Sequence, residues 1–259
     1  MRASRAIKIC LGLTMVWALL LAASCGGGSE RELLVFTAAS LKPALTDLIN
    51  RYEGDTGENV LISTGGSQLL ARQIAAGAPV DVYVPAGMSP VEFLANEGVP
   101  MDESVSLVTN RLVIVTKEGE PAPESVAALA SDAFSRIAIA DPALAPAGAY
   151  AREALKTQGV WDAVQGKLVV GSNVRVTIAY VETGNADAAL VYATDAFLAA
   201  DLVLTDVVPQ SSHTAIVYPA VVLADSDQVA LAMSFVEYLQ STEAGDVFAD
   251  YGFIPIVAP

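Results

Sequence analysis

The sequence predicts an α/β protein with two doubly wound lobes and a ligand cleft between them. Short apolar runs suited to strands alternate with stretches of helical spacing, which indicates sheets covered by helices. The pattern restarts near residue 112, and its elements are too many for one small sheet. With 259 residues, 53% of them apolar, the chain can bury two cores.

A leader for secretion precedes this alternating pattern. Arg2, Arg5 and Lys8 come before an apolar run from Ile9 to Ala23, and no acidic residue occurs before Glu30. The run is too short for a comfortable membrane span, so residues 1–24 are predicted to be a signal peptide.

The end of the leader resembles a bacterial lipobox, Leu21-Ala22-Ala23-Ser24-Cys25. This resemblance implies cleavage before Cys25 and lipidation of that residue. The alternative is ordinary signal cleavage that leaves Cys25 unmodified. Residues 25–30 contain three glycines and a serine, and we expect them to form a flexible tether.

The chain after cleavage is strongly acidic. Its 11 basic and 29 acidic residues give a net charge of −18, which argues against nucleic-acid binding. It retains one cysteine, so an intrachain disulfide is impossible. We expect the protein to work in the cell envelope, outside the cytoplasm and tied to a membrane surface.

The first block of elements alternates strand and helix from residue 33 onward. Ser40 lies where an N-cap belongs, and Gly54 is expected to stop the helix that follows it. Strands are predicted at 33–37, 60–63 and 80–84, and helices at 41–52, about 67–76 and 91–95.

The second block repeats the alternation, and the C-terminal segment adds a strand and two helices. Strands are predicted at 112–115, 137–140, 168–170, 188–191 and 215–223, and helices at 125–130, 149–156, 174–181, 228–239 and 241–251. The order predicts mostly parallel sheets with helices on both faces. Lobe one is expected to comprise residues 31–110 plus 214–259, and lobe two residues 111–213. The two crossings, near Asn110 and His213, would form a hinge.

Several kinds of catalytic site have little support. His213 is the only histidine, so a multi-histidine metal site cannot form, although carboxylate sites for Ca²⁺ or Mg²⁺ stay open. The chain has no Gly-x-Ser-x-Gly elbow, phosphate loop or dinucleotide fingerprint. Asp81, at a strand start, is interpreted as a structural hydrogen-bond acceptor rather than a general base.

Neutral hydrogen-bond donors occur where strands turn into helices. Ser40 and Ser67 lie at such junctions in the first block, and Pro146-Ala147-Gly148 and Ser172-Asn173-Val174 lie at similar junctions in the second. In wound sheets ligands bind beyond the carboxyl ends of the strands. Several helix N-termini aimed at one cleft would make an anion site without Lys or Arg. Each serine taken singly is better explained as a structural cap.

The same junctions carry a resemblance to the periplasmic molybdate-binding proteins of ABC transporters. It covers about Leu33 to Phe253, with motifs in the same order and at similar spacing. The matching stretches are Phe36-Thr37-Ala38-Ala39-Ser40-Leu41, Ala71-Arg72-Gln73-Ile74-Ala75-Ala76-Gly77-Ala78-Pro79, Asp141-Pro142, Pro146-Ala147-Gly148-Ala149-Tyr150-Ala151, Leu190-Val191-Tyr192-Ala193-Thr194-Asp195-Ala196 and Tyr251-Gly252-Phe253.

The resemblance implies a periplasmic binding protein of type II that captures molybdate, and tungstate with it, for an ABC permease. It implies hydroxyl and main-chain donors from Ser40 and Ser67, main-chain N–H groups from Ala147 and Val174, and the phenol of Tyr192. Molybdenum would enter only as its oxyanion, with no cofactor, no free metal cation and no enzymatic activity. We expect a monomer.

Alternatives remain for the ligand and for single residues. The protein could be a receptor for sulfate or another oxyanion, or a secreted hydrolase that uses His213 or a carboxylate. Without the resemblance, Tyr192 is better explained as a core tyrosine. Arg72 and Arg175 are candidate anion clamps, with surface ion pairing as the other explanation.

Overall fold

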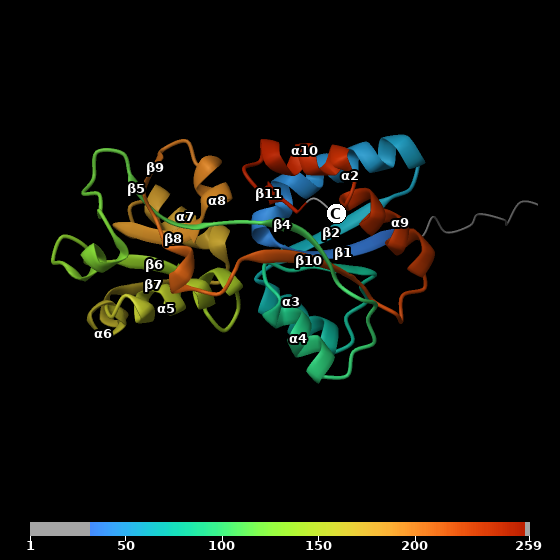
Figure 1. Ribbon diagram of the computed structural model, residues 1–259, viewed down its shortest axis with the longest axis horizontal. Coiled ribbons are helices and arrows are strands. Elements are labelled where there is room, and N and C mark those ends of the chain that lie inside the picture. The colour runs from blue at the N-terminus through green and yellow to red at the C-terminus, as the bar shows by residue number, and fades with distance from the viewer. Residues whose placement is uncertain (1–31, 257–259) are drawn as a thin grey trace, which may run out of the picture. The chain divides into compact units, whose positions relative to one another are not determined.

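Two separate β-sheets form the framework of the chain (Figure 1). The structure is a computed structural model that describes residues 32–256. The predicted leader at 1–24, Cys25 and the tether at 25–30 lie outside these residues. Within 32–256, no helix combines the length and the apolar character needed to cross a bilayer.

The first sheet has six strands and carries the N-terminal βαβ units. In spatial order its strands are β11 (Ile254–Pro255), β4 (Val105–Thr109), β10 (Val217–Val222), β3 (Val82–Val84), β1 (Leu33–Ala38) and β2 (Val60–Gly65). The strand β1 is parallel to both β2 and β3, whereas β10 is antiparallel to β3 and β4, and β11 is antiparallel to β4.

Helices cover both faces of the first sheet. They are α2 (Lys42–Thr56), α3 (Ser67–Ala75), α4 (Ser89–Asn96), α9 (Val229–Leu239) and α10 (Thr242–Asp250). The chain leaves β1 for β2 on one side and then returns from β2 to β3 on the other side of β1. Right-handed crossovers in opposite directions place α2 and α3 on opposite faces, as Figure 1 shows.

Side chains alternate between these two faces along the central strands. Val35 and Val82 belong to the apolar cluster that includes the buried residues of α2, α9 and α10. Phe36 and Tyr83, the next residues along each strand, belong to the cluster under α3 and α4. This period of two is what a sheet covered on both faces requires.

The second sheet has five strands and is wound in the same way. Its strands are β7 (Leu168–Gly171), β6 (Ile137–Ala140), β8 (Ala188–Tyr192), β5 (Leu112–Lys117) and β9 (Leu202–Val207). Pairs β6–β7 and β6–β8 are parallel, and β5 is antiparallel to β8 and β9. The helices of this part are α5 (Pro146–Thr157), α6 (Trp161–Val164), α7 (Val174–Glu182) and α8 (Ala193–Phe197), and α5 and α7 cover opposite faces.

The sheets are mixed, which corrects the prediction of mostly parallel sheets. Four of the nine strand pairings in residues 32–256 are parallel and five are antiparallel. The antiparallel strands lie next to the two points where the chain crosses between the sheets, from β4 to β5 and from β9 to β10. No βαβ unit fixes the strand direction at these points. The first sheet takes its strands from residues 33–109 and 217–255, and the second from residues 112–207.

Individual elements also differ from the sequence prediction. Gly54 lies inside α2, because Gly57, with φ +76°, adopts the left-handed conformation that ends the helix. Residues 126–130 form a 3₁₀ helix, η2 (Val126–Ala130), instead of an α-helix. Four described elements with short or interrupted patterns, β4, α6, α8 and β9, and the two-residue strand β11 were not predicted. Further 3₁₀ turns are η1 (Ala39–Leu41), η3 (Gln165–Lys167) and η4 (Gln210–Ser212).

Two glycines inside helices offer a matched test of how closely α5 packs on β6. A Cβ at Gly148 would overlap the carbonyl of Ala140, whereas at Gly245 in α10 it would meet Pro255 Cβ at 3.7 Å. We expect Gly148→Ala to lower the free energy of unfolding by roughly 2 kcal/mol or more, and Gly245→Ala to raise it by up to about 1 kcal/mol. Urea unfolding of both variants measures this, and a stabilising Gly148→Ala would contradict the packing.

Candidate functional site

A small cavity lies where the carboxyl ends of strands from both sheets meet. It is lined from the first part of the chain by Ala38, Ala39, Ser40, Gly65, Gly66, Ser67 and Ala86, and from the second by Ala145, Pro146, Ala147, Asn173, Val174 and Tyr192. All five residues proposed from the resemblance line it. A volume of about 10 Å³ suits one water or one small ion.

Ser40 reaches the cavity from a 3₁₀ turn and not as a helix cap, which corrects the sequence prediction. It lies within η1 and is 2% exposed, while Leu41 occupies the N-cap position of α2. Its Oγ lies 3.1 Å from the hydroxyl of Tyr218 on β10. The tertiary partner therefore replaces the local backbone partner that an N-cap serine would use.

Ser67 begins α3 with its hydroxyl proton free for the cavity. Its Oγ accepts a hydrogen bond from the N–H of Ala86 at 3.0 Å, and its carbonyl accepts from the Tyr83 hydroxyl at 2.6 Å. These two contacts hold the main chain and the hydroxyl oxygen of Ser67 in place. An Oγ that already accepts one bond can donate its single proton to a ligand.

The preceding glycine lets the two parts of the chain meet at this edge. A Cβ at Gly66 would collide with the carbonyl oxygen of Leu144 and lie 2.9 Å from that of Ser172. The N–H of Leu69 donates to the carbonyl of Leu144 at 3.2 Å. At this point of the cavity wall the main chain at Gly66 therefore packs directly against the main chain at Leu144 and Ser172.

The starts of α5 and α7 bring main-chain donors to the opposite wall. The helix α5 begins with Pro146 and has no capping side chain, so the N–H of Ala147 is not capped. At α7, Asn173 Oδ1 accepts from the N–H groups of Arg175 and Val176, and the N–H of Val174 remains uncapped. Partial positive charge at both helix starts adds to the attraction for an anion.

Tyr192 ends β8 and brings an unsatisfied hydroxyl to the cavity. The residue is 1% exposed, and its hydroxyl has no hydrogen-bond partner among residues 32–256. Burial raises the pKa of this phenol well above its usual value, so it keeps its proton. A buried donor without an acceptor is costly, and its position in the wall of a cavity points to a ligand atom as its partner.

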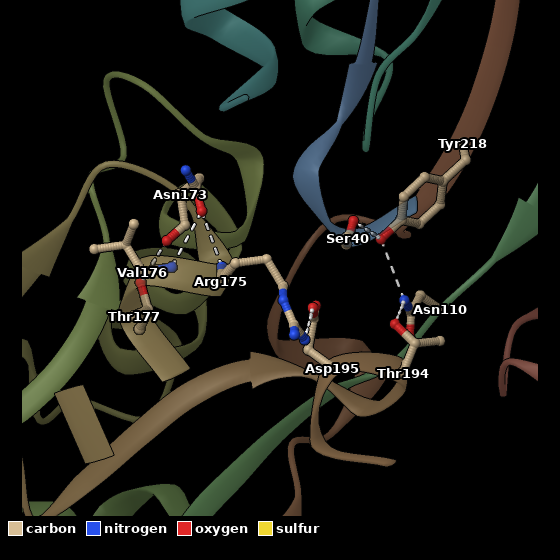
Figure 2. A network of polar contacts seen from close by, with 9 residues as sticks. All are labelled: Ser40, Asn110, Asn173, Arg175, Val176, Thr177, Thr194, Asp195 and Tyr218. Carbon is tan, nitrogen blue, oxygen red and sulfur yellow. Dashed lines mark hydrogen bonds and ion pairs between the residues drawn. The ribbon is translucent and has the colours of Figure 1, made fainter. Parts of the chain in front are cut away.

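Among the described residues, no Lys, Arg, His, Asp or Glu lines this cavity. Arg72 is exposed on α3, and Arg175 pairs with Asp195 at 3.4 Å (Figure 2). His213 lies outside the lining, with Nδ1 2.7 Å from the carbonyl oxygen of Thr214. Over residues 32–256, no cluster of three or more His, Cys, Asp or Glu side chains could hold a metal ion.

Asp81 accepts hydrogen bonds from the N–H of Leu34 at 2.7 Å and from the Ser226 hydroxyl, which confirms its structural role.

Four buried polar residues beside the cavity were not singled out from the sequence. Asn110, Thr194 and Tyr218 form a chain of hydrogen bonds that ends at Ser40, and Asp195 lies next to it along the chain (Figure 2). Asn110 was placed only at a crossing, and Tyr218 only within an apolar strand. A polar residue inside an apolar strand indicates a buried hydrogen bond, but the sequence does not identify the residue that forms the other half of that bond.

Asp195 makes the stability of the fold dependent on pH. It is 1% exposed, and burial raises its pKa to about 7 despite the neighbouring Arg175 guanidinium. Between about pH 4 and pH 7 the folded state binds more protons than the unfolded chain, so stability falls as pH rises. We expect Asp195→Asn to be more stable than the wild type at about pH 8, by on the order of a few kcal/mol, and to lack this slope. Urea unfolding at about pH 5 and pH 8 measures both, and an unchanged slope would contradict it.

Known proteins resemble the chain over almost the whole described region. Residues 33–254 match the family of bacterial extracellular solute-binding proteins. A Bacillus subtilis protein named as an ABC transporter substrate-binding lipoprotein is 36% identical, over 95% of this chain and 98% of its own. The molybdate-binding protein ModA of Escherichia coli is 31% identical, over 86% of this chain and 89% of its own.

Solved structures show the same architecture. The periplasmic molybdate-binding protein of Azotobacter vinelandii has a TM-score of 0.77 and 25% identity, with 86% of this chain and 99% of that chain covered. A sulfate-binding protein of Mycobacterium tuberculosis shares the fold, with a TM-score of 0.74, 16% identity and 87% of each chain covered. The α/β fold with two wound sheets and the placement among binding proteins that are not enzymes are thereby confirmed. The chain belongs to the family of bacterial extracellular solute-binding proteins.

Proposed function

We propose that this protein captures molybdate, and tungstate with it, outside the cytoplasm and delivers the ion to an ABC permease. The observation that carries the proposal is the hydroxyl of Tyr192, which is buried, protonated and unpartnered in the wall of a small cavity without charged side chains. Relatives named as molybdate-binding proteins, at 31% identity, support the choice of ion.

A cavity of neutral donors suits a fully deprotonated tetrahedral oxyanion. Burying a dianion without hydrogen bonds is prohibitively costly, and donors to each oxygen offset that cost. The proposed donors are the hydroxyls of Ser40, Ser67 and Tyr192 and the N–H groups of Ala147 and Val174. Without a buried counter-charge the affinity stays finite, so the ion can be released to a transporter.

Closure of two lobes around the ion would prepare it for delivery. We propose lobe one at residues 31–110 plus 214–259, lobe two at 111–213, and hinges near Asn110 and His213. The cavity draws its lining from both sheets, and a hydrogen bond from the N–H of Thr214 to Glu153, at 2.7 Å, ties one crossing to α5. In this proposal the protein acts as a monomer, and its closed form is the one that binds the permease.

Removing the Tyr192 hydroxyl should separate binding from folding. Tyr192→Phe takes away a donor that bonds nothing within residues 32–256, so the unliganded protein should stay as stable as the wild type or become slightly more stable. Loss of a bond to a charged ligand should weaken molybdate binding roughly 10- to 100-fold. Isothermal titration and thermal unfolding with molybdate, tungstate, sulfate and phosphate measure both effects.

Tyr238→Phe is the matched control, because the Tyr238 hydroxyl on α9 is also buried without a partner but lies outside the cavity lining. Wild-type protein in about a hundredfold excess of ligand over its dissociation constant should gain about 2.7 kcal/mol of stability, roughly 5–10 °C. A larger shift with sulfate than with molybdate would make this a sulfate receptor. Equal affinities for Tyr192→Phe and wild type would remove Tyr192 from the site.

We further propose that residues 1–24 are cleaved and that Cys25 carries a lipid anchor. In a bacterial host the full chain should fractionate with membranes and be released by detergent, because a diacylated N-terminus holds stably to a bilayer. Cys25→Ser should abolish that association, whereas Cys10→Ser, in the apolar run of the leader, should leave it intact. Membrane association of the Cys25→Ser variant would contradict the anchor.

A further inference from the structure

We propose that Asn110 and Tyr218 are positioning residues that make the Ser40 hydroxyl a donor into the cavity, and that this polarity rejects oxyanions that carry a proton. Neither side chain lines the cavity, so both act through Ser40. The inference rests on the proposed function, because it requires an oxyanion at Ser40.

The orientation of the Asn110 side chain is fixed by its own backbone. Oδ1 accepts a hydrogen bond from the N–H of Arg111 at 2.8 Å, which leaves the amide nitrogen on the other side. Nδ2 donates to the Thr194 hydroxyl at 2.9 Å and to the Tyr218 hydroxyl at 3.2 Å (Figure 2). Both amide hydrogens are thereby used, and Asn110 can only donate to Tyr218.

Tyr218 transmits this direction to Ser40. Its side chain is fully buried, and burial raises the pKa of the phenol well above its usual value, so the proton stays on the oxygen. The hydroxyl accepts from Asn110 and shares a second hydrogen bond, of 3.1 Å, with Ser40 Oγ. If Ser40 donated instead, the buried phenol proton would lose this acceptor, which is unfavourable.

Ser40 therefore accepts from Tyr218 and has its own proton left over. The residue is 2% exposed and lines the cavity, so the hydroxyl can donate this proton to a ligand in the cavity. The rings around Tyr218 hold this geometry, with centroids of Tyr192 and Phe253 at 5.9 and 5.3 Å. The chain of donors runs in one direction, from Asn110 through Tyr218 to Ser40 and on to the ligand.

This direction distinguishes ligands by their protons. Near pH 8, sulfate and phosphate are tetrahedral dianions of similar size, but phosphate keeps one proton that needs an acceptor. A Ser40 hydroxyl that must donate cannot accept the proton of hydrogen phosphate, and the two hydrogens repel each other when they face one another. Every oxygen of sulfate or molybdate can instead accept the hydrogen bond from Ser40. The relay would therefore penalise hydrogen phosphate without affecting proton-free ions.

Asn110→Asp should reverse the relay with little change of shape. One carboxylate oxygen still accepts from the N–H of Arg111, and the other accepts where Nδ2 donated. Tyr218 then donates to residue 110 and accepts from Ser40, which turns a lone pair of Ser40 toward the cavity. The added negative charge weakens all dianions, so the informative quantity is a ratio of affinities between ions of equal charge.

The test is titration of the purified protein with molybdate, sulfate and phosphate at about pH 8. For Asn110→Asp we expect the molybdate-to-phosphate affinity ratio to fall at least about tenfold, with the molybdate-to-sulfate ratio within about threefold of wild type. Tyr218→Phe, which frees Ser40 to rotate, should move the first ratio in the same direction by a smaller factor. It provides the test if Asn110→Asp does not fold.

Tyr83→Phe is the matched control, because it removes a buried hydroxyl that contacts the main chain of Ser67 and takes no part in the relay. It should weaken all three ions alike and leave both ratios unchanged. A molybdate-to-phosphate ratio unaltered in the relay variants, or altered together with the sulfate ratio, would overturn the inference while the wild type still binds molybdate. A wild type that binds none of the three ions would overturn the proposed function as well.

Discussion

A buried anion without a counter-charge needs a hydrogen-bond donor at each of its oxygens, and the arrangement around the cavity follows from this requirement. Hydroxyls and main-chain N–H groups supply donors without a competing acceptor when their own lone pairs are already occupied. Ser67 meets this condition through the N–H of Ala86, and Ser40 meets it through Tyr218. Tyr192 differs, because its hydroxyl has no partner among residues 32–256 and its proton is therefore unused.

The winding of the two sheets brings these donors together. In each sheet the chain passes from a central strand to the neighbour on one side and then to the neighbour on the other side. Strand ends and helix starts therefore gather at one edge. Main-chain contact between Gly66 and the Leu144 and Ser172 carbonyls then joins the two edges closely. A small cavity results, because most of its lining is main chain and small side chains.

The acidic surface and the neutral site serve different purposes. Twenty-nine acidic residues against 14 basic ones favour solubility and repel anions at long range, but salt screens that repulsion beyond roughly 8–10 Å. Inside the cavity only short-range donors act. Arg175, the cation nearest in sequence to the cavity lining, is bound to the buried Asp195, which keeps its charge away from a ligand.

The sequence by itself determined the α/β class and the order of most elements, since apolar periodicity is local. The family resemblance carried by the motifs at the strand ends pointed to five of the thirteen residues that line the cavity. The sequence did not determine the mixed strand directions, because antiparallel pairing of β10 with β3 and β4 depends on contacts far apart in the chain. Nor could it determine the function of the Ser40 hydroxyl. A serine before a helix is most simply a cap, and only the fold brings Tyr218, 178 residues away, to within hydrogen-bonding distance of it. Local patterns specify which donors exist, and tertiary contacts decide in which direction each of them donates.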